Sequence, residues 1–124
     1  MTATDQALQM TRLAAEAAVE KKGRDLVAFD VSEQLAITDV FLVVTGTSDR
    51  QVGAIVDAIT ESMRDELGLS PARREGDKEN RWVLLDYLDI VIHVQHEEER
   101  VYYALERLWA DCPEIDLEIE EQEE

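Results

Sequence analysis

Two apolar runs separated by a short acidic linker constrain this chain most. The runs are Trp82–Leu85 and Ile90–Val94, and the linker between them reads Asp86-Tyr87-Leu88-Asp89. The linker is too short for the crossover connection that parallel strands require, so the two runs are predicted to form an antiparallel hairpin. Any fold for this chain must contain that hairpin.

A helix is predicted directly after the hairpin. Glu97, Glu98 and Glu99 suit the positive end of a helix dipole. An apolar stripe at helical spacing follows them, and it consists of Val101, Ala104, Leu105 and Leu108. The stripe predicts one continuous helix with a single apolar face.

The first half of the chain predicts a helix and two strands. The helix begins at a threonine cap, Thr2 or Thr4, and Gly23 ends it. Asp25–Val31 alternates and is a strand candidate, whereas Val40–Val44 is apolar without alternation. The second pattern is typical of a strand buried on both faces.

A second long helix is predicted from Ser48 to Gly68. Ser48 and Gln51 have capping-box spacing, and Gly68 is a stop signal. A short strand over Ala72–Glu75 completes the order α-β-β-α-(β)-β-β-α. This order predicts an α/β domain in two or three layers, with a mixed β-sheet flanked by helices.

Four motifs in this order resemble the ribosomal silencing factor family, also called RsfS or Iojap. Two are the hairpin, Trp-Val-x-Leu-Asp-Tyr-x-Asp-x-Val-x-His, and the helix, Arg-Val-Tyr-Tyr-x-Leu-Glu-x-Leu-Trp. The others are Thr38-Asp39-x-Phe41 and Thr45-Gly46-x-Ser48-x-Arg50-Gln51-Val52. The resemblance covers residues 8–111 and implies a nucleotidyltransferase-like fold. One departure is Leu88, where the family usually has glycine in the hairpin turn.

The resemblance also implies a function. It implies a factor that binds a protein on the intersubunit face of the large ribosomal subunit and sterically blocks subunit joining. Translation would be repressed under nutrient limitation, and a role in large-subunit assembly is implied as well. We therefore expect no enzymatic activity, no catalytic residue, no cofactor and no metal.

The charge of the chain independently predicts the class of partner. Its formal net charge is −17, and phosphate backbones repel such a chain because nucleic-acid affinity comes largely from Lys and Arg. The expected direct partner is a basic protein rather than RNA. No apolar run approaches the roughly 20 residues of a membrane span, and the N-terminal residues do not resemble a secretory signal. With Cys112 as the single cysteine, a reduced cytoplasmic setting is expected.

The chain is expected to form one domain over residues 1–110, followed by an acidic tail over residues 111–124. The tail has eight acidic residues and no Lys or Arg, so a solvated tail is the favoured prediction. The alternative is an edge strand, because Ile115, Leu117 and Ile119 alternate.

The hairpin turn is the predicted partner-binding surface. Asp86 and Asp89 bracket Tyr87, and Trp82 begins the first strand. Carboxylates suit a basic partner, and Trp and Tyr are enriched among binding hot spots. For both rings a core position is the open alternative. Arg50 and Gln51, at the start of the second helix, form the next candidate surface.

A nucleotidyltransferase-like phosphotransfer enzyme is the alternative function. Ser48 follows Gly46 at a strand-to-helix turn, where helix N–H groups can receive an anion. A helix cap explains Ser48 better, because Gln51 stands at the matching position. Asp39, Asp86 and Asp89 were weighed as metal ligands, but their spacing does not match the usual close acidic pair.

Two further alternatives remain open from the sequence. His93 and His96 lack a third metal ligand of convincing spacing, so a partly buried His93 is favoured. A dimeric adaptor without a ribosomal role is the third functional class, since the alanine-rich first helix could serve a homodimer seam or the core.

Overall fold

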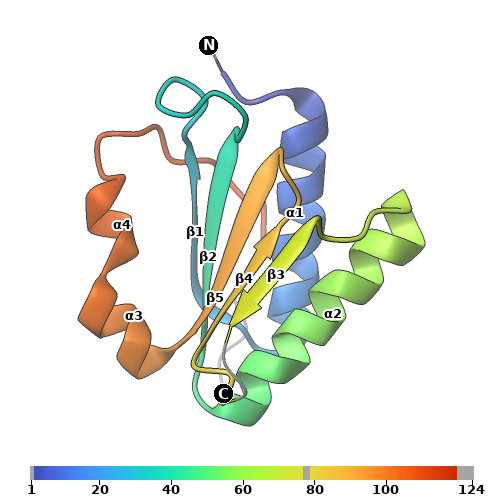
Figure 1. Ribbon diagram of the computed structural model, residues 1–124, viewed down its shortest axis with the longest axis vertical. Coiled ribbons are helices and arrows are strands. Elements are labelled where there is room, and N and C mark those ends of the chain that lie inside the picture. Colours follow the sequence, from blue (N-terminus) through green and yellow to red (C-terminus); the bar gives the residue numbers. More distant parts are fainter. Residues whose placement is uncertain (1, 77–78, 120–124) are drawn as a thin grey trace.

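A five-stranded mixed sheet with the order β1-β2-β5-β4-β3 forms the centre of the structure (Figure 1). The computed structural model describes residues 2–76 and 79–119, with side chains except at residues 102, 103, 105 and 106. The strands are β1 (Arg24–Asp30), β2 (Val40–Gly46), β3 (Arg73–Gly76), β4 (Trp82–Asp86) and β5 (Ile90–His96). β2 and β5 are parallel, and all other neighbours are antiparallel.

The predicted hairpin is confirmed as β4 and β5, with Leu84 opposite His93. The predicted buried strand, β2, lies inside the sheet between β1 and β5.

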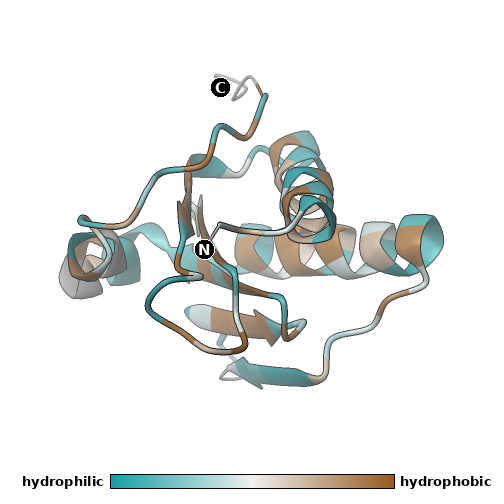
Figure 2. Ribbon diagram, turned by 90° about the horizontal axis from the view of Figure 1, so that it is seen from above, coloured by the Kyte–Doolittle hydropathy of each residue, from teal (hydrophilic) through white to brown (hydrophobic). Residues whose placement is uncertain are grey.

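The helices lie on both sides of the sheet, and the predicted mixed α/β architecture is confirmed. α1 (Asp5–Glu20) and α2 (Asp49–Leu67) cover one face, whereas α3 (Glu97–Tyr103) and α4 (Leu105–Leu108) lie on the other side (Figure 2). The main core lies between the sheet and the first two helices. Its largest fully buried side chains include Met10, Leu42, Ile55, Ile59, Met63, Leu85 and Ile92.

Specific residues fix the two ends of α1. The Thr4 hydroxyl accepts a hydrogen bond from the Ala7 amide at 3.1 Å, as an N-cap does. At the other end Lys22, rather than Gly23, adopts the left-handed conformation, with φ 63°. Gly23 is needed for another reason, because a Cβ there would lie 2.9 Å from the Ala18 carbonyl oxygen.

The start of α2 is tied to the end of α1. The Ser48 hydroxyl accepts a hydrogen bond from the Gln51 amide at 3.1 Å, so the predicted cap is confirmed. The Gln51 side chain accepts from Thr47 and donates to the Lys21 and Lys22 carbonyl oxygens at 3.1 Å each. α2 ends at Gly68, whose φ is 67°.

The hairpin turn requires a left-handed backbone conformation at residue 88, and Leu88 adopts it where the family usually has glycine. Leu88 has φ 71°, a conformation that costs a non-glycine residue roughly 1–2 kcal/mol. The turn is supported by the Leu88 amide, which donates to the Asp86 carboxylate at 2.8 Å, and by the Tyr87 amide, which donates to the Ile90 carbonyl oxygen at 2.9 Å. The Asp86 side chain therefore supplies the local hydrogen bond that aspartate commonly supplies in turns.

The prediction of one continuous helix after the hairpin is wrong. The helix breaks at Ala104, whose φ is 45°, and α4 continues in a new direction. Val101 and Leu108 are largely exposed. The left-handed residue interrupts the predicted stripe, and Val101 and Leu108 are not buried as that stripe requires.

The prediction of a solvated tail is also wrong for the residues that are described. The Ile115 amide donates to the Ala28 carbonyl oxygen at 2.8 Å, and the Asp30 amide donates to the Pro113 carbonyl oxygen at 2.8 Å. Leu117 is 7% exposed and belongs to the main core. The apolar side chains of this segment are buried against β1 and α1. Their burial stabilises the packed position by more than repulsion among the neighbouring acidic residues destabilises it. Residues 120–124 of the predicted tail lie outside the described residues.

This packing predicts that Leu117→Ala destabilises the protein. The loss of a buried leucine side chain should lower the free energy of unfolding by about 2–3 kcal/mol. Leu108→Ala is the matched control, because it removes the same atoms from an exposed site and should change stability by less than about 0.5 kcal/mol. Urea unfolding of both variants measures the difference, and equal stabilities would restore the solvated-tail interpretation.

Candidate functional site

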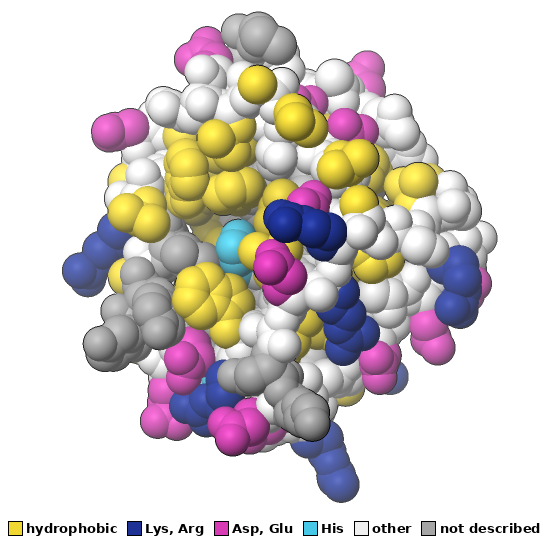
Figure 3. Space-filling model, viewed as in Figure 1, with side chains coloured by type: hydrophobic (Ala, Val, Ile, Leu, Met, Phe, Trp, Pro, Cys, Tyr) yellow, Lys and Arg dark blue, Asp and Glu magenta, His cyan; other side chains and the backbone are white. Residues whose placement is uncertain are grey.

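An apolar patch lies on the sheet face opposite α1 and α2, and it is only partly covered. We call it the sheet patch, and it consists of Phe41, Trp82, Leu84, Val91, His93 and Trp109. Strand register brings these side chains together, since Phe41 lies opposite Val91 and Leu84 lies opposite His93. Figure 3 shows hydrophobic side chains gathered around a histidine on this face. Phe41, Trp82, Leu84 and Trp109 are half-buried, so part of each remains open to a partner.

His93 holds the aromatic rings of the sheet patch in place. The Trp82 indole Nε1 donates to His93 Nδ1 at 3.2 Å. The Phe41 ring meets the His93 ring edge-on at 5.5 Å between centroids, and it meets the Trp109 ring edge-on at 4.9 Å. Because Nδ1 accepts a hydrogen bond, the imidazole must be neutral at that nitrogen. Burial lowers the pKa of His93 from 6.5 to about 4, so the patch carries no charge from this residue near neutral pH.

Tyr87 occupies the core position that the sequence left open, rather than an exposed position at the turn. Its side chain is 7% exposed and belongs to the main core. It continues the side of the hairpin occupied by Val83 and Leu85, which faces α1 and α2. Burial raises the pKa of the Tyr87 hydroxyl.

Trp82 begins β4 and Asp86 ends it. Four residue steps of a strand separate Trp82 from Asp86, which is about 13 Å. Asp86 is half-buried and pairs with Arg73 at 3.4 Å. Asp86 shares the face of Leu84 and Trp82 and so lies at the edge of the sheet patch. The half-buried Asp89 lies beyond the turn, where its carbonyl oxygen accepts from the Asp39 amide at 2.7 Å.

Arg50 is exposed at the start of α2, as are its neighbours Ser48 and Asp49. Gln51 is predicted beside Arg50 as part of the same candidate surface. The oxygen and the nitrogen of the Gln51 side-chain amide both form hydrogen bonds within the chain. These hydrogen bonds join α1 to α2, and contact of Gln51 with a partner stays a prediction.

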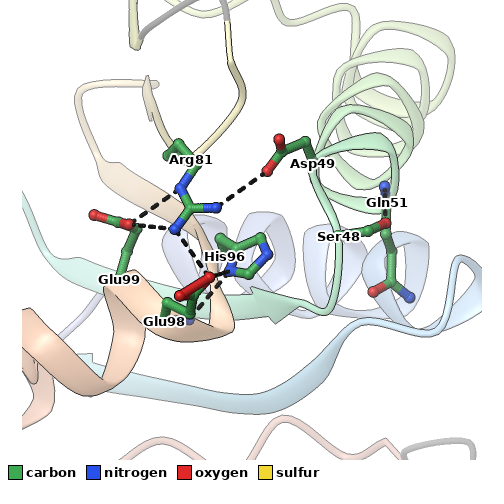
Figure 4. Close-up of polar contacts among 7 residues, drawn as sticks. All are labelled: Ser48, Asp49, Gln51, Arg81, His96, Glu98 and Glu99. Atoms are coloured by element: carbon green, nitrogen blue, oxygen red, sulfur yellow. Dashed lines mark hydrogen bonds and ion pairs between the residues drawn. The ribbon is translucent and has the colours of Figure 1, made fainter.

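An ion-pair cluster lies between the start of α2 and the start of α3 (Figure 4). Arg81 contacts Glu99 at 3.0 Å, Glu98 at 3.2 Å and Asp49 at 3.6 Å. Hydrogen bonds with Glu99, and next with Glu98, raise the pKa of the Arg81 guanidinium. The His96 imidazole caps α3 by accepting from the Glu98 amide at 3.1 Å.

The residues weighed for phosphotransfer serve local structure. The Ser48 hydroxyl caps α2, and the Asp39 carboxylate accepts from the Thr4 amide at 3.0 Å. Across the described ranges, no three His, Cys, Asp or Glu side chains come together as a metal ion would need. In the same ranges no helix is long and apolar enough to span a membrane.

Comparison with known proteins settles the family. The model of a family described as "Ribosomal silencing factor during starvation" matches residues 4–124. This chain belongs to that family. Ribosomal silencing factor RsfS of Bacillus subtilis is 43% identical to it over 107 residues, which are 86% of this chain and 90% of that protein.

Two further relatives extend the comparison. A crystal structure of a Chromobacterium violaceum protein superposes with a TM-score of 0.78 at 31% identity, covering 90% of this chain and 92% of that one. The mouse protein named "Mitochondrial assembly of ribosomal large subunit protein 1" is 29% identical over 92 residues, which are 73% of this chain and 40% of that protein. The chain therefore spans less than half of the mouse protein.

In this member of the ribosomal silencing factor family, sequence reasoning found Trp82 but missed most of the sheet patch. The sequence predicts that Phe41 lies in a strand buried on both faces, whereas its side chain is half-buried. Leu84 follows Trp82 by two residues, and that alternation was the available signal. Trp109 is distant in sequence from both, so only the fold brings it to Phe41.

The buried His93 predicts a specific dependence of stability on pH. Its folded-state pKa of about 4 lies below the ordinary value of 6.5, so between these pH values the unfolded chain binds a proton that the folded chain does not. Stability should therefore fall as pH drops from about 6.5 toward 4, by about 2 kcal/mol at pH 5. Urea unfolding at pH 7 and pH 5 measures this for the parent and for His93→Gln.

The comparison of the two proteins isolates the histidine. All other ionisable groups are present in both, so the parent should lose about 2 kcal/mol more than His93→Gln between the two pH values. The same loss in both proteins would show that His93 does not resist protonation.

Proposed function

We propose that this chain represses translation by binding, through the sheet patch, a basic protein on the intersubunit face of the large ribosomal subunit. While bound, it sterically prevents the small subunit from joining, under nutrient limitation. No covalent step is required. Membership of the ribosomal silencing factor family supports ribosome-associated silencing, and the proposal adds the surface, the partner class and the mechanism.

The sheet patch is the observation that carries this proposal. Trp82, Leu84 and Phe41 expose part of their apolar surface on paired strands. Rimmed apolar patches mark interaction sites, and tryptophan is prominent among residues that dominate binding energy. Because the rings are already held by His93, little side-chain freedom would be lost on binding.

The charge of the chain supports a basic protein as the direct contact. At a net charge of −17, long-range attraction speeds encounter with a basic protein and opposes contact with RNA. Asp86 and Arg73 lie beside the apolar centre, so the surface has the polar rim and apolar middle of a specific interface.

The name of the mouse relative supports the large subunit as the target and is consistent with a second role in large-subunit assembly. The sequence motifs of the hairpin, in which Trp82 stands, point to the same target through the family resemblance.

Sedimentation with separated ribosomal subunits tests the target. We expect the chain to co-sediment with the large subunit and to remain in the supernatant with the small one, because the partner protein is present only on the large subunit. Binding to both subunits alike, or to ribosomal RNA stripped of protein, would refute the proposal.

Binding kinetics on immobilised large subunits test the surface. We expect Trp82→Ala and Leu84→Ala to accelerate dissociation. Each substitution should weaken binding by roughly 1–3 kcal/mol, the loss typical of a hot-spot side chain. Asp89→Asn should instead slow association and weaken its salt dependence, because rim charges act mainly on encounter.

Two controls accompany these variants. Ile37→Ala removes exposed apolar surface outside the sheet patch and should bind like the parent. A melting curve for each variant separates unfolding from loss of contact. If folded Trp82 and Leu84 variants bind normally, the contact surface lies elsewhere, and Arg50 at the start of α2 is the next position to change.

A further inference from the structure

We infer that Arg81 is a positioning residue for the sheet patch: it holds the start of α3 against the edge of the sheet where Trp82 begins β4. This inference rests on the proposed function, because it concerns the shape of the surface that the partner meets. Arg81 itself need not touch the partner.

Arg81 joins three elements through one guanidinium group (Figure 4). Its Nε and Nη2 atoms donate to a Glu99 carboxylate oxygen at 3.2 and 3.0 Å, and Nη2 also donates to Glu98 at 3.2 Å. Its Nη1 atom lies 3.6 Å from the Asp49 carboxylate in the first turn of α2. The beginnings of β4, α2 and α3 are thereby held together.

The three ion pairs are not equal. The Glu99 side chain is only 24% exposed and receives two N–H groups of Arg81, whereas Glu98 is 70% and Asp49 is 52% exposed. Water and salt weaken exposed pairs far more than sheltered ones. The contact with Glu99 should therefore contribute most.

The backbone connects the same cluster to the sheet patch. The Arg81 carbonyl oxygen accepts from the His96 amide at 2.8 Å, and His96 caps α3 through its imidazole. Trp82 follows Arg81 directly and donates to His93. A shift of α3 at its first turn would thus be transmitted to the ring of Trp82.

The Arg100 guanidinium holds the middle of α3 to β2 by donating to the Thr45 hydroxyl at 2.6 Å, and the first turn of α3 needs an attachment of its own. α3 has seven residues, too few to be stable as an isolated helix, and Val101 on it is exposed rather than packed. Without the Arg81 charge, the carboxylates of Asp49, Glu98 and Glu99 would face one another uncompensated in a chain of net charge −17. Their repulsion would move the start of α3 away from the sheet.

The test compares Arg81→Gln, Glu99→Gln and Glu98→Gln in dissociation kinetics from large subunits. We expect Arg81→Gln and Glu99→Gln to dissociate roughly fivefold faster than the parent, and Glu98→Gln to change by less than about twofold. Arg81→Lys should recover part of the effect, because it restores the charge without the forked geometry.

A charge exchange separates positioning from direct contact. Arg81→Glu combined with Glu99→Arg should restore dissociation to within about twofold of the parent, since the pair is rebuilt in reverse. If Arg81 instead contacts the partner, the exchanged protein will bind as poorly as Arg81→Glu alone, and the inference is overturned.

Tryptophan fluorescence reads the patch without any ribosome. In a Trp109→Phe background Trp82 is the remaining tryptophan of the two in the chain, and Arg81→Gln should shift its emission to the red as the ring becomes more exposed. Unchanged emission together with unchanged dissociation refutes the inference.

A parent protein that fails to bind large subunits refutes the proposed function instead, and the emission shift then decides the role of Arg81. If Arg81→Gln does not fold, Glu99→Gln and Arg81→Lys carry both measurements.

Discussion

The parallel pairing of β2 with β5 is the constraint on which the rest of the structure depends. Parallel neighbours require a crossover connection, and such connections are almost always right-handed. The crossover here contains α2, which therefore packs beside α1 on one face of the sheet. The remaining helices, α3 and α4, are short and leave part of the opposite face open. The sheet patch exists because the chain has two long helices and both are used on the same side.

Because the long helices cover only one face of the sheet, the apolar contact area and the acidic charge that the proposed function needs lie in different parts of the molecule. The apolar contact area lies on rigid paired strands, while most of the acidic charge lies on exposed helix and loop positions. A neutral His93 under the rings avoids placing a charge at the centre of the patch. Long-range attraction and short-range packing can then act on the same basic partner without interfering with each other.

The surroundings of the hairpin rings and of Gln51 depend on contacts that the local sequence does not specify. The position of Tyr87 and Trp82 in the hairpin leaves open which ring is exposed, and the answer follows from the alternation by which a strand sends successive side chains to opposite faces. Tyr87 therefore follows Val83 and Leu85 into the core, and Trp82 follows the opposite alternation to the sheet patch. Likewise Gln51 has the composition of a surface residue, yet its amide is consumed where two helix ends meet.

What the sequence determined by itself was local. The hairpin, the caps at Thr4 and Ser48, the Gly68 stop and the order of elements all depend on residues close in the chain. Its motifs also placed the chain in its family. Tertiary structure decided which side chains share a surface, because Phe41, Trp82 and Trp109 meet only through strand order and the return of the chain after α4. It also decided that residues 112–119 pack against β1, since burial of Leu117 depends on a core assembled from distant segments. Composition reports the acidity of that segment but not the burial of Leu117 in the main core.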